Sequence, residues 1–197
     1  MKLYKTLRRI VLTYFQLFFK FRVKGKENIP SSGPVILIAN HISNYDPPVL
    51  ASAIDRPIRF MAKEELFKIP LFGAFLYKVG AFPVKRGGND RKAIKQAFQV
   101  LKENQVLGIF PEGTRSKTGQ LGKGMPGAAL LAIKSDAEII PVGIQSTYKW
   151  FQPIHINIGR PIPLDSYKQE KVKSEDLEEV IGILMAHIQK QLDEMKG

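Results

Sequence analysis

The chain has 197 residues, which is enough for one domain with a substantial core and too few for two domains of ordinary size. A hydrophobic content of 44% with 24% charged residues excludes a disordered chain, and the absence of cysteine excludes disulfides, thiolate nucleophiles and cysteine-ligated metal. The formal net charge of +12 suits a nucleic acid, an anionic lipid or an acidic carrier as a partner, and charge alone does not choose among them.

The N-terminal segment combines basic with bulky apolar residues. Residues 1–26 contain eight basic residues and no acidic one. Apolar residues at helical spacing predict an amphipathic helix over residues 1–22: Leu3, Leu7, Ile10, Tyr14, Leu17, Phe18 and Phe21. Its longest apolar stretch, residues 10–19, is shorter than the roughly 20 residues that span a bilayer, and no signal-peptide cleavage site follows.

Two interpretations of this helix remain open. It either lies in a lipid interface or packs on its own domain with its basic residues in solvent. The four phenylalanines between residues 15 and 21 cover more of the circumference than one core-facing stripe needs, which favours the lipid interface. We therefore divide the chain into a membrane-associating helix, residues 1–26, and a folded domain, residues 27–197.

Strands and helices alternate along the rest of the chain. Apolar runs predict strands over residues 34–39, 58–61, 81–84, 106–110, 138–145 and 154–158. Helices are predicted over residues 47–53, 91–103, 128–135 and 175–195, with Asp90 as the cap of the second. Short helices are predicted over 63–77, broken at Pro70 and Gly73. This order indicates a single α/β domain with a mixed, largely parallel sheet and helices on both faces.

The first chemistry-bearing segment is Asn40-His41-Ile42-Ser43-Asn44-Tyr45-Asp46, directly after a buried strand. In a regular helix, residues five apart do not face each other, so His41 and Asp46 can meet only if the chain turns between them. An aspartate that accepts a hydrogen bond from one ring nitrogen leaves the other nitrogen as a base. The alternative is that Asp46 only caps the following helix and His41 is a loop histidine.

The second segment is Phe110-Pro111-Glu112-Gly113-Thr114-Arg115-Ser116, which also follows an apolar strand. Glycine allows a close backbone approach, and arginine binds phosphate oxygens with a planar fork of donors. A polar loop in which Glu112 pairs with Arg115 is the alternative. Backbone amides near Gly113 or in the turn after His41 are candidates to stabilise an oxyanion.

Two further segments carry weaker signals. Residues 63–86 run from Lys63 to Arg86, which ends a short strand before two glycines and is a candidate anion ligand or an exposed basic turn. Ile139-Ile140-Pro141-Val142-Gly143 is typical of a buried strand. The sequence has no Gly-x-Ser-x-Gly elbow, no Walker loop, no Gly-x-Gly-x-x-Gly and no metal-ligand spacing of His and carboxylates.

Together these segments resemble the four sequence blocks of the glycerolipid acyltransferase family. The family's His-x-x-x-x-Asp block matches residues 41–46, and its second block matches residues 63–86. Its Phe-Pro-Glu-Gly-Thr-Arg-Ser block is matched residue for residue at 110–116, and its fourth block matches Ile140-Pro141-Val142. The blocks occur in family order and cover roughly residues 30 to 145.

The resemblance implies a fold like that of glycerol-3-phosphate acyltransferase. It also implies transfer of a fatty acyl group from an acyl thioester to the sn-2 hydroxyl of 1-acyl-sn-glycerol 3-phosphate, which gives phosphatidic acid for phospholipid biosynthesis. His41 would be the general base and Asp46 the residue that orients it. The implied substrate-binding residues are Lys63, Arg86 and Arg115 for the phosphate, and Glu112, Gly113 and Thr114 near the glycerol end.

The resemblance implies no cofactor and no metal, since acyl-CoA or an acyl-carrier protein serves as the acyl-donor substrate. The expected partners are a membrane lipid surface and lysophosphatidic acid, at the cytoplasmic face of the cell membrane, with peripheral or monotopic attachment. Glycerol 3-phosphate or another lysophospholipid is an alternative acceptor, and a non-catalytic module that binds anionic lipid is an alternative function. Nucleic acid is not expected, because no recognition motif or aromatic platform accompanies the basic residues.

Overall fold

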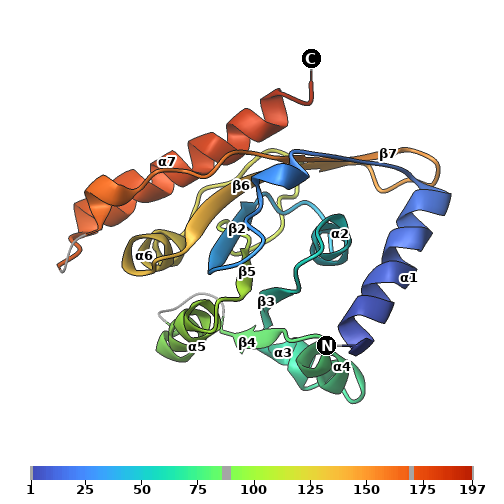
Figure 1. Cartoon of the computed structure of the whole chain (residues 1–197), viewed down its shortest axis with the longest axis horizontal. Coiled ribbons are helices and arrows are strands. Elements are labelled where there is room, and N and C mark those ends of the chain that lie inside the picture. Colours follow the sequence, from blue (N-terminus) through green and yellow to red (C-terminus); the bar gives the residue numbers. More distant parts are fainter. Residues whose placement is uncertain (1, 86–89, 169–170, 197) are drawn as a thin grey trace.

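In the residues that this computed structural model describes, 2–85, 90–168 and 171–196, seven strands form one mixed sheet (Figure 1). Their order is β1-β7-β6-β2-β5-β3-β4, and every neighbouring pair is parallel except β6 with β7. The strands are β1 (Lys20–Lys24), β2 (Val35–Ala39), β3 (Ile58–Lys63), β4 (Phe82–Val84), β5 (Val106–Ile109), β6 (Glu138–Ser146) and β7 (Pro153–Ile158). The expected mixed, largely parallel sheet is confirmed.

Helices cover both faces of the sheet (Figure 1). The first face carries α1 (Lys2–Phe18) and α2 (Asp46–Ala53), and the second carries α5 (Arg91–Lys102), α6 (Pro126–Lys134) and α7 (Ser174–Asp193). Two short helices, α3 (Glu64–Phe67) and α4 (Phe72–Lys78), connect β3 to β4. Short 3-10 turns occupy Lys26–Asn28 and Asp165–Tyr167.

The central strand β2 shows why the sequence there is apolar throughout. Val35, Leu37 and Ala39 pack with the core beneath α1 and α2, whereas Ile36 and Ile38 pack with the core beneath α5, α6 and α7. All five side chains are fully buried. A parallel strand covered on both faces buries every side chain, so no polar residue alternates with the apolar ones.

The N-terminal helix ends earlier than predicted. It stops at Phe18 instead of continuing to residue 22, and residues 20–24 form β1, which pairs in parallel with β7 at the edge of the sheet. The basic residues of β1 are exposed while Phe21 and Val23 are half-buried, which is the period-two pattern of a strand. Basic and aromatic residues also suit an amphipathic helix, so the sequence pattern predicted a helix that continues past its actual end at Phe18.

The two interpretations of α1 each hold for one of its faces. Phe15 is 2% exposed and packs with Phe19 in the core beneath α1 and α2, whereas Leu3, Ile10 and Leu17 are exposed. The expected boundary at residue 26 therefore does not separate two structural units, and a membrane role for residues 1–26 stays a prediction. No helix within residues 2–85, 90–168 and 171–196 is both long and apolar enough to cross a bilayer.

Two other local predictions have different outcomes. Asp90 caps α5 as predicted, because its carboxylate accepts the backbone N–H groups of Lys92 and Ala93. Gly73, predicted to break a helix, instead lies inside α4 and is buried. A Cβ at this position would come within 2.2 Å of the Phe67 carbonyl oxygen, so glycine is needed there because α4 packs closely on α3.

Candidate active site

The site lies where the loops after β2 and β5 meet. These strands are parallel neighbours, so the loops that follow them both lie at the carboxyl ends of the strands, where α/β proteins usually place functional loops. The loop after β2 carries His41, and the loop after β5 carries Glu112. The Ser116 N–H donates to the His41 carbonyl at 2.7 Å, which joins the two loops directly.

His41 and Asp46 form a buried pair. His41 Nδ1 lies 2.7 Å from Asp46 Oδ2, and the two residues are 7% and 0% exposed. The prediction that a turn brings them together is confirmed. With Nδ1–H donating to the carboxylate, the tautomer is fixed and Nε2 keeps its lone pair for a proton of the substrate.

Asp46 does not cap α2, so the alternative that this aspartate serves only as a helix cap is wrong. The helix begins at Asp46 itself, and Tyr45 occupies the cap position without a side-chain hydrogen bond. The Asp46 carboxylate instead points back over the loop, where Oδ2 also accepts the N–H groups of Ile42 and Ser43, each at 2.7 Å. These bonds hold the turn on which the pair depends.

Glu112 holds the His41 loop from the other side. Its Oε1 accepts the His41 N–H at 2.7 Å and its Oε2 accepts the Gly122 N–H at 2.8 Å. Both oxygens bind backbone, so the alternative of a Glu112–Arg115 pair is wrong. The geometry gives this buried carboxylate a positioning role, and direct contact of Glu112 with a substrate stays a prediction.

The backbone N–H groups that were candidates to stabilise an oxyanion already donate hydrogen bonds within the protein. The N–H groups of His41, Ile42 and Ser43 all donate to the two buried carboxylates, and the Gly113 N–H donates to the Phe110 carbonyl at 3.0 Å. A run of three amides that point inward at carboxylates stabilises these negative charges. It does not leave the same groups available for a developing oxyanion.

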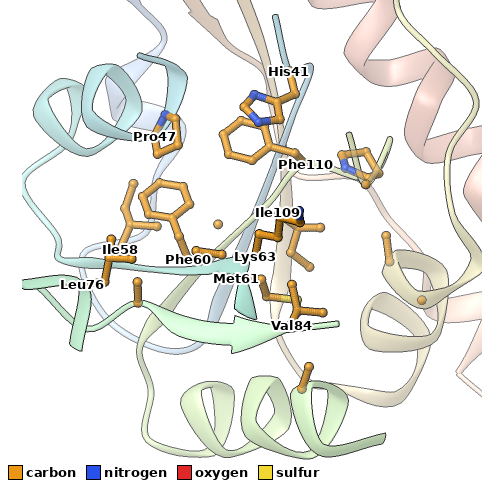
Figure 2. A pocket seen from close by; sticks show the side chains of 18 of the residues that line it. His41, Pro47, Ile58, Phe60, Met61, Lys63, Leu76, Val84, Ile109 and Phe110 are labelled. Carbon is orange, nitrogen blue, oxygen red and sulfur yellow. The ribbon is translucent and has the colours of Figure 1, made fainter. Parts of the chain in front are cut away.

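An aromatic stack fixes the plane of the imidazole (Figure 2). The rings of His41 and Phe110 stack with centroids 4.2 Å apart, and Phe60 continues the stack 6.0 Å from Phe110. Phe110 lies in the predicted second segment, but its apolar side chain gave no signal of this role. Packing against the Phe110 ring keeps the imidazole of His41 from turning out of this plane.

Tyr148 is a member of the site that sequence reasoning missed. Its hydroxyl donates to Asp46 Oδ1 at 2.5 Å, so both carboxylate oxygens are hydrogen-bonded. Burial, together with the charge and hydrogen bond of Asp46, raises the pKa of Tyr148 well above its usual value, so the phenol remains a proton donor. The residue lies in the β6–β7 loop, outside any motif, and has a positive φ of 53°.

Asn40 was also missed as a structural contributor. Its side-chain amide donates to the Ile144 carbonyl at 2.8 Å and accepts the Ile144 N–H at 2.7 Å. The buried side chain thereby continues the pairing between β2 and β6 beyond the last residue of the strand. An asparagine directly after an apolar run and before a candidate base was the available signal.

His41 lines a cavity of about 1760 Å³. Of the predicted site residues, the structure brings His41, Lys63, Glu112, Gly113 and Thr114 to its wall. Arg115 is exposed and is not among the lining residues, and Arg86 lies outside the described residues. Asp46 lies behind His41, fully buried.

The remaining polar groups offer weaker contacts. Lys63 Nζ lies 3.3 Å from Glu65 Oε1, and both side chains are largely exposed, so water weakens this pair and leaves the lysine available to an anion. Within the three described stretches of the chain, no group of three His, Asp or Glu side chains converges as metal ligands would. The arrangement supplies an oriented base beside a large, mostly apolar cavity whose lining includes basic side chains such as Lys63.

Comparison with known proteins agrees with this geometry. The family model described as Acyltransferase matches residues 20–145. The chain is 32% identical over 186 residues to the 1-acyl-sn-glycerol-3-phosphate acyltransferase of Borreliella burgdorferi, covering 90% of this chain and 73% of that protein. It is 33% identical over 195 residues to the protein of that name from Streptococcus pneumoniae, covering 95% and 72%.

Other relatives are longer than this chain. The chloroplastic 1-acyl-sn-glycerol-3-phosphate acyltransferase LPAT1 of Arabidopsis thaliana is 34% identical over 135 residues, and the match spans only 38% of that protein. Among solved structures, the 1-acyl-sn-glycerophosphate (LPA) acyltransferase PlsC from Thermotoga maritima superposes with a TM-score of 0.76 at 25% identity. That match covers 100% of this chain and 79% of the other. The chain belongs to the acyltransferase family.

Proposed function

We propose that this chain is an O-acyltransferase that moves a fatty acyl group from an acyl thioester to the sn-2 hydroxyl of 1-acyl-sn-glycerol 3-phosphate. The product is phosphatidic acid, for phospholipid biosynthesis. The observation that carries the proposal is the buried His41–Asp46 pair, whose histidine lines a large and mostly apolar cavity. Its relatives are named for this reaction.

The proposed reaction is a single displacement. His41 Nε2 takes the proton of the acceptor hydroxyl while the hydroxyl oxygen attacks the thioester carbonyl carbon. The tetrahedral intermediate then collapses with cleavage of the C–S bond, and the imidazolium returns its proton to the departing thiolate. Asp46 stabilises the imidazolium, and no acyl-enzyme is formed, which fits a chain without cysteine.

The acceptor phosphate is proposed to bind at the rim of the cavity. Lys63 lines the cavity near His41, and Arg115 immediately precedes the residue whose amide donates to the His41 carbonyl. A guanidinium fork and an ammonium group are both suited to phosphate oxygens. Thr114, which lines the same wall, is placed to contact the glycerol end.

The membrane contact is proposed to involve the outer face of α1. Leu3, Ile10 and Leu17 are 48%, 60% and 67% exposed on a helix with four basic residues and no acidic one. The α3–α4 turn also exposes Ile69, Leu71, Phe72 and Phe75. Phe72 and Phe75 line the same cavity as Tyr4 and Leu7 of α1. The outer face of α1 and this turn both suit the interface of the cytoplasmic membrane leaflet.

One assay tests the proposed reaction. Purified protein is incubated with radiolabelled lysophosphatidic acid, glycerol 3-phosphate or another lysophospholipid, and with palmitoyl-CoA or palmitoyl-acyl-carrier protein. We expect labelled phosphatidic acid as the main product. Vesicle binding without turnover of any acceptor would instead indicate a non-catalytic lipid-binding module.

The matched variants are His41→Ala and His187→Ala. His187 lies on α7, and it hydrogen-bonds the Ile183 carbonyl without lining the cavity. We expect His41→Ala to reduce kcat about 10²- to 10⁴-fold with an unchanged circular dichroism spectrum, since a general base contributes that much. His187→Ala should retain wild-type turnover, and full activity of His41→Ala would reject the mechanism.

Vesicle flotation tests the membrane contact. We expect wild-type protein to float with vesicles that contain phosphatidylglycerol, and Ile10→Glu or Leu17→Glu to remain at the bottom of the gradient. Ala186→Glu, which adds the same charge to an exposed position of α7, is the control. Flotation of all four proteins to the same extent would exclude the outer face of α1 as the contact.

A further inference from the structure

The loop between β6 and β7, residues 147–152, exposes two adjacent aromatic side chains. Trp150 and Phe151 are 62% and 63% exposed, and their ring centroids lie 6.5 Å apart in an edge-to-face arrangement. Single exposed apolar residues are common on soluble proteins and need no explanation. Two large aromatic rings side by side at the tip of one loop instead indicate a contact surface.

The backbone of this loop fixes the two rings in their exposed positions. Tyr148 and Phe151 have φ angles of 53° and 62°, in the left-handed region that bulky residues rarely adopt. The Phe151 N–H donates to the Phe18 carbonyl at 2.7 Å, and the Tyr148 N–H donates to Ser146 Oγ at 2.9 Å. Backbone strain that is held by such contacts is typical of functional loops.

The aromatic pair continues the exposed apolar face of α1. Trp150 packs on Phe18, the last residue of the helix, with ring centroids 5.3 Å apart. Figure 1 shows the turn between β6 and β7 beside this end of α1. Leu17 is exposed here, and Ile10 and Leu3 follow on the same face at intervals of seven residues. The loop and the helix therefore form one continuous surface.

The charges around the aromatic pair are basic. Lys149 and Lys20 are exposed, and neither has an ion-pair partner in the parts of the chain that the structure describes. Residues 1–26 and 139–164, which include α1, β1, β7 and the loop, contain no acidic residue.

This combination of groups identifies the partner. Tryptophan is enriched at the boundary between headgroups and acyl chains, and lysines beside it bind the phosphates of anionic lipids. A second copy of the chain, docked through the same surface, would place the like charges of Lys149 and Lys20 against each other. An anionic lipid bilayer therefore fits this surface better than a second copy does.

We infer that the β6–β7 loop is a lipid contact, in which Trp150 and Phe151 enter the interface of an anionic membrane and Lys149 binds lipid phosphates. This contact is additional to the one proposed for α1. The same loop carries Tyr148, whose hydroxyl donates to Asp46, so lipid bound at its tip lies close in the chain to the catalytic pair.

Trp150 allows a direct test, because it is the only tryptophan of the chain. Its fluorescence is recorded on the wild-type protein, first in buffer and then with vesicles of phosphatidylcholine, with or without phosphatidylglycerol. We expect the emission maximum to move to shorter wavelength with phosphatidylglycerol vesicles, since the indole ring leaves water. An emission maximum that already lies at short wavelength in buffer and does not move with vesicles would indicate contact with another copy, and would overturn the inference.

Brominated lipids then locate the ring. Bromine atoms near the headgroup end of the acyl chain should quench Trp150 more than bromine atoms near its methyl end, because the ring lies at the interface and not in the bilayer centre. An absence of quenching by either lipid, in samples in which the protein floats with the vesicles, would show that Trp150 remains in water.

Two variants keep Trp150 as the reporter and change its neighbours. Phe151→Glu should lower partitioning into phosphatidylglycerol vesicles about tenfold or more, because one aromatic ring no longer enters the interface. Lys149→Glu should lower it about tenfold, since a basic residue near an anionic surface contributes about 1 kcal/mol and the variant reverses that charge.

The controls for these variants are Ala186→Glu and Lys190→Glu, which make the same changes at exposed positions of α7. Both should partition like the wild type, and circular dichroism should show that all four variants are folded. Partitioning of Phe151→Glu equal to that of Ala186→Glu would overturn the inference. The fluorescence of the wild type decides the question if Phe151→Glu does not fold.

Trp150→Ala tests what the contact contributes to turnover, and this part rests on the proposed acyl transfer. We expect the apparent KM for lysophosphatidic acid in phosphatidylglycerol vesicles to rise about tenfold, as partitioning falls. With a short-chain acceptor dissolved as monomers, kcat and KM should match the wild type. An equal loss with both acceptors would mean that the loop acts on the site through Tyr148 and not through lipid.

The outcomes separate this inference from the proposed function. If the wild-type protein forms no acylated product but Trp150 is quenched by brominated lipid, the proposed reaction fails and the lipid contact stands. If the protein forms product and floats with vesicles but Trp150 is not quenched, the inference fails alone and α1 remains the proposed membrane contact.

Discussion

The two strand-exit loops that form the site differ in how firmly they are held. In the loop after β2, the side chains of His41 and Asp46 and three consecutive amides are buried or hydrogen-bonded. In the loop after β5, Glu112 is equally well held, but residues 113–120 are almost all exposed, including Arg115. A base must be held within fractions of an ångström to transfer a proton, whereas a long cationic side chain can reach a phosphate from solvent.

Asp46→Asn should have the largest effect on kcat, because it removes the charge that faces His41 in the well-held loop after β2 and keeps the hydrogen bonds of that loop. The asparagine oxygen can accept the bonds of Oδ2 while its NH₂ group faces the Tyr148 oxygen, which can accept. We expect kcat to fall about 10²- to 10⁴-fold, because the imidazolium loses its counter-charge. Steady-state kinetics should show unchanged KM values and thermal denaturation an unchanged Tm.

The control for Asp46→Asn is Asp136→Asn at an exposed position. A kcat within a factor of two for Asp46→Asn would mean that its charge has no part in the reaction.

Glu112→Gln tests whether the buried carboxylate holds the His41 loop. Either orientation of the amide places an NH₂ group against a backbone N–H, of His41 or of Gly122, that now lacks an acceptor. We expect the free energy of unfolding to fall by about 1–3 kcal/mol, as for a buried donor left unpaired, and kcat to fall about tenfold or more. Urea denaturation and steady-state assays measure these effects, with exposed Glu138→Gln as the control.

If Glu112 instead acts only by touching substrate, Glu112→Gln should raise the acceptor KM without lowering stability.

Arg115→Ala addresses the exposed loop. We expect the acceptor KM to rise about tenfold with little change in kcat, because a charge-assisted hydrogen bond to phosphate mainly supports binding. Arg115→Lys should recover part of the loss. Arg160→Ala is the control. This exposed arginine follows β7, which is antiparallel to β6, so it lies at the opposite end of the strands from the site.

An equal rise in acceptor KM for Arg115→Ala and Arg160→Ala would indicate a general effect of surface charge and not a specific phosphate contact.

Tyr148→Phe should have the smallest effect. The lost hydrogen bond to Asp46 is worth about 0.5–1.5 kcal/mol, so kcat should fall about two- to tenfold with unchanged KM values. Because the pKa of Tyr148 is raised, its neutral form is favoured in the folded state, and this contribution is present below the ordinary tyrosine pKa of about 10. The ratio of wild-type to variant kcat should therefore stay constant from acid to neutral pH.

Tyr167→Phe controls for loss of a tyrosine–carboxylate hydrogen bond. Tyr167 donates to Glu179 at 2.5 Å, and it does not line the cavity. A loss of kcat as large in this control would remove any specific role for Tyr148.

What could be read from the sequence follows from local pattern. Continuous apolar runs located β2 and β5, and the polar residues directly after each run located the two loops of the site. Tyr148 could not be found in this way, because it is 102 positions from Asp46 and only the β6–β7 pairing brings it back. The same limit applies to Asn40, whose partner Ile144 is 104 positions away.

The role of Glu112 shows a different limit. Its motif indicated a functional loop, but a carboxylate can bind substrate, a cation or backbone amides, and the choice depends on which groups surround it. The proximity of the His41 and Gly122 amides comes from the parallel pairing of β2 with β5 and from the course of the following loop. Likewise, β1 was not clearly distinguished from the preceding helix, since lysine and phenylalanine suit either structure.

The burial of Phe15 and Phe19 has a practical consequence for anyone preparing this protein. In many lipid enzymes a membrane-binding segment can be deleted to obtain a fragment that is easily handled in water. Here a version beginning at residue 27 would lose β1 and would uncover Ile154 and Ile156, which pack in the same core as the two phenylalanines. Purification therefore requires the whole N-terminal segment, because its removal would expose part of the core.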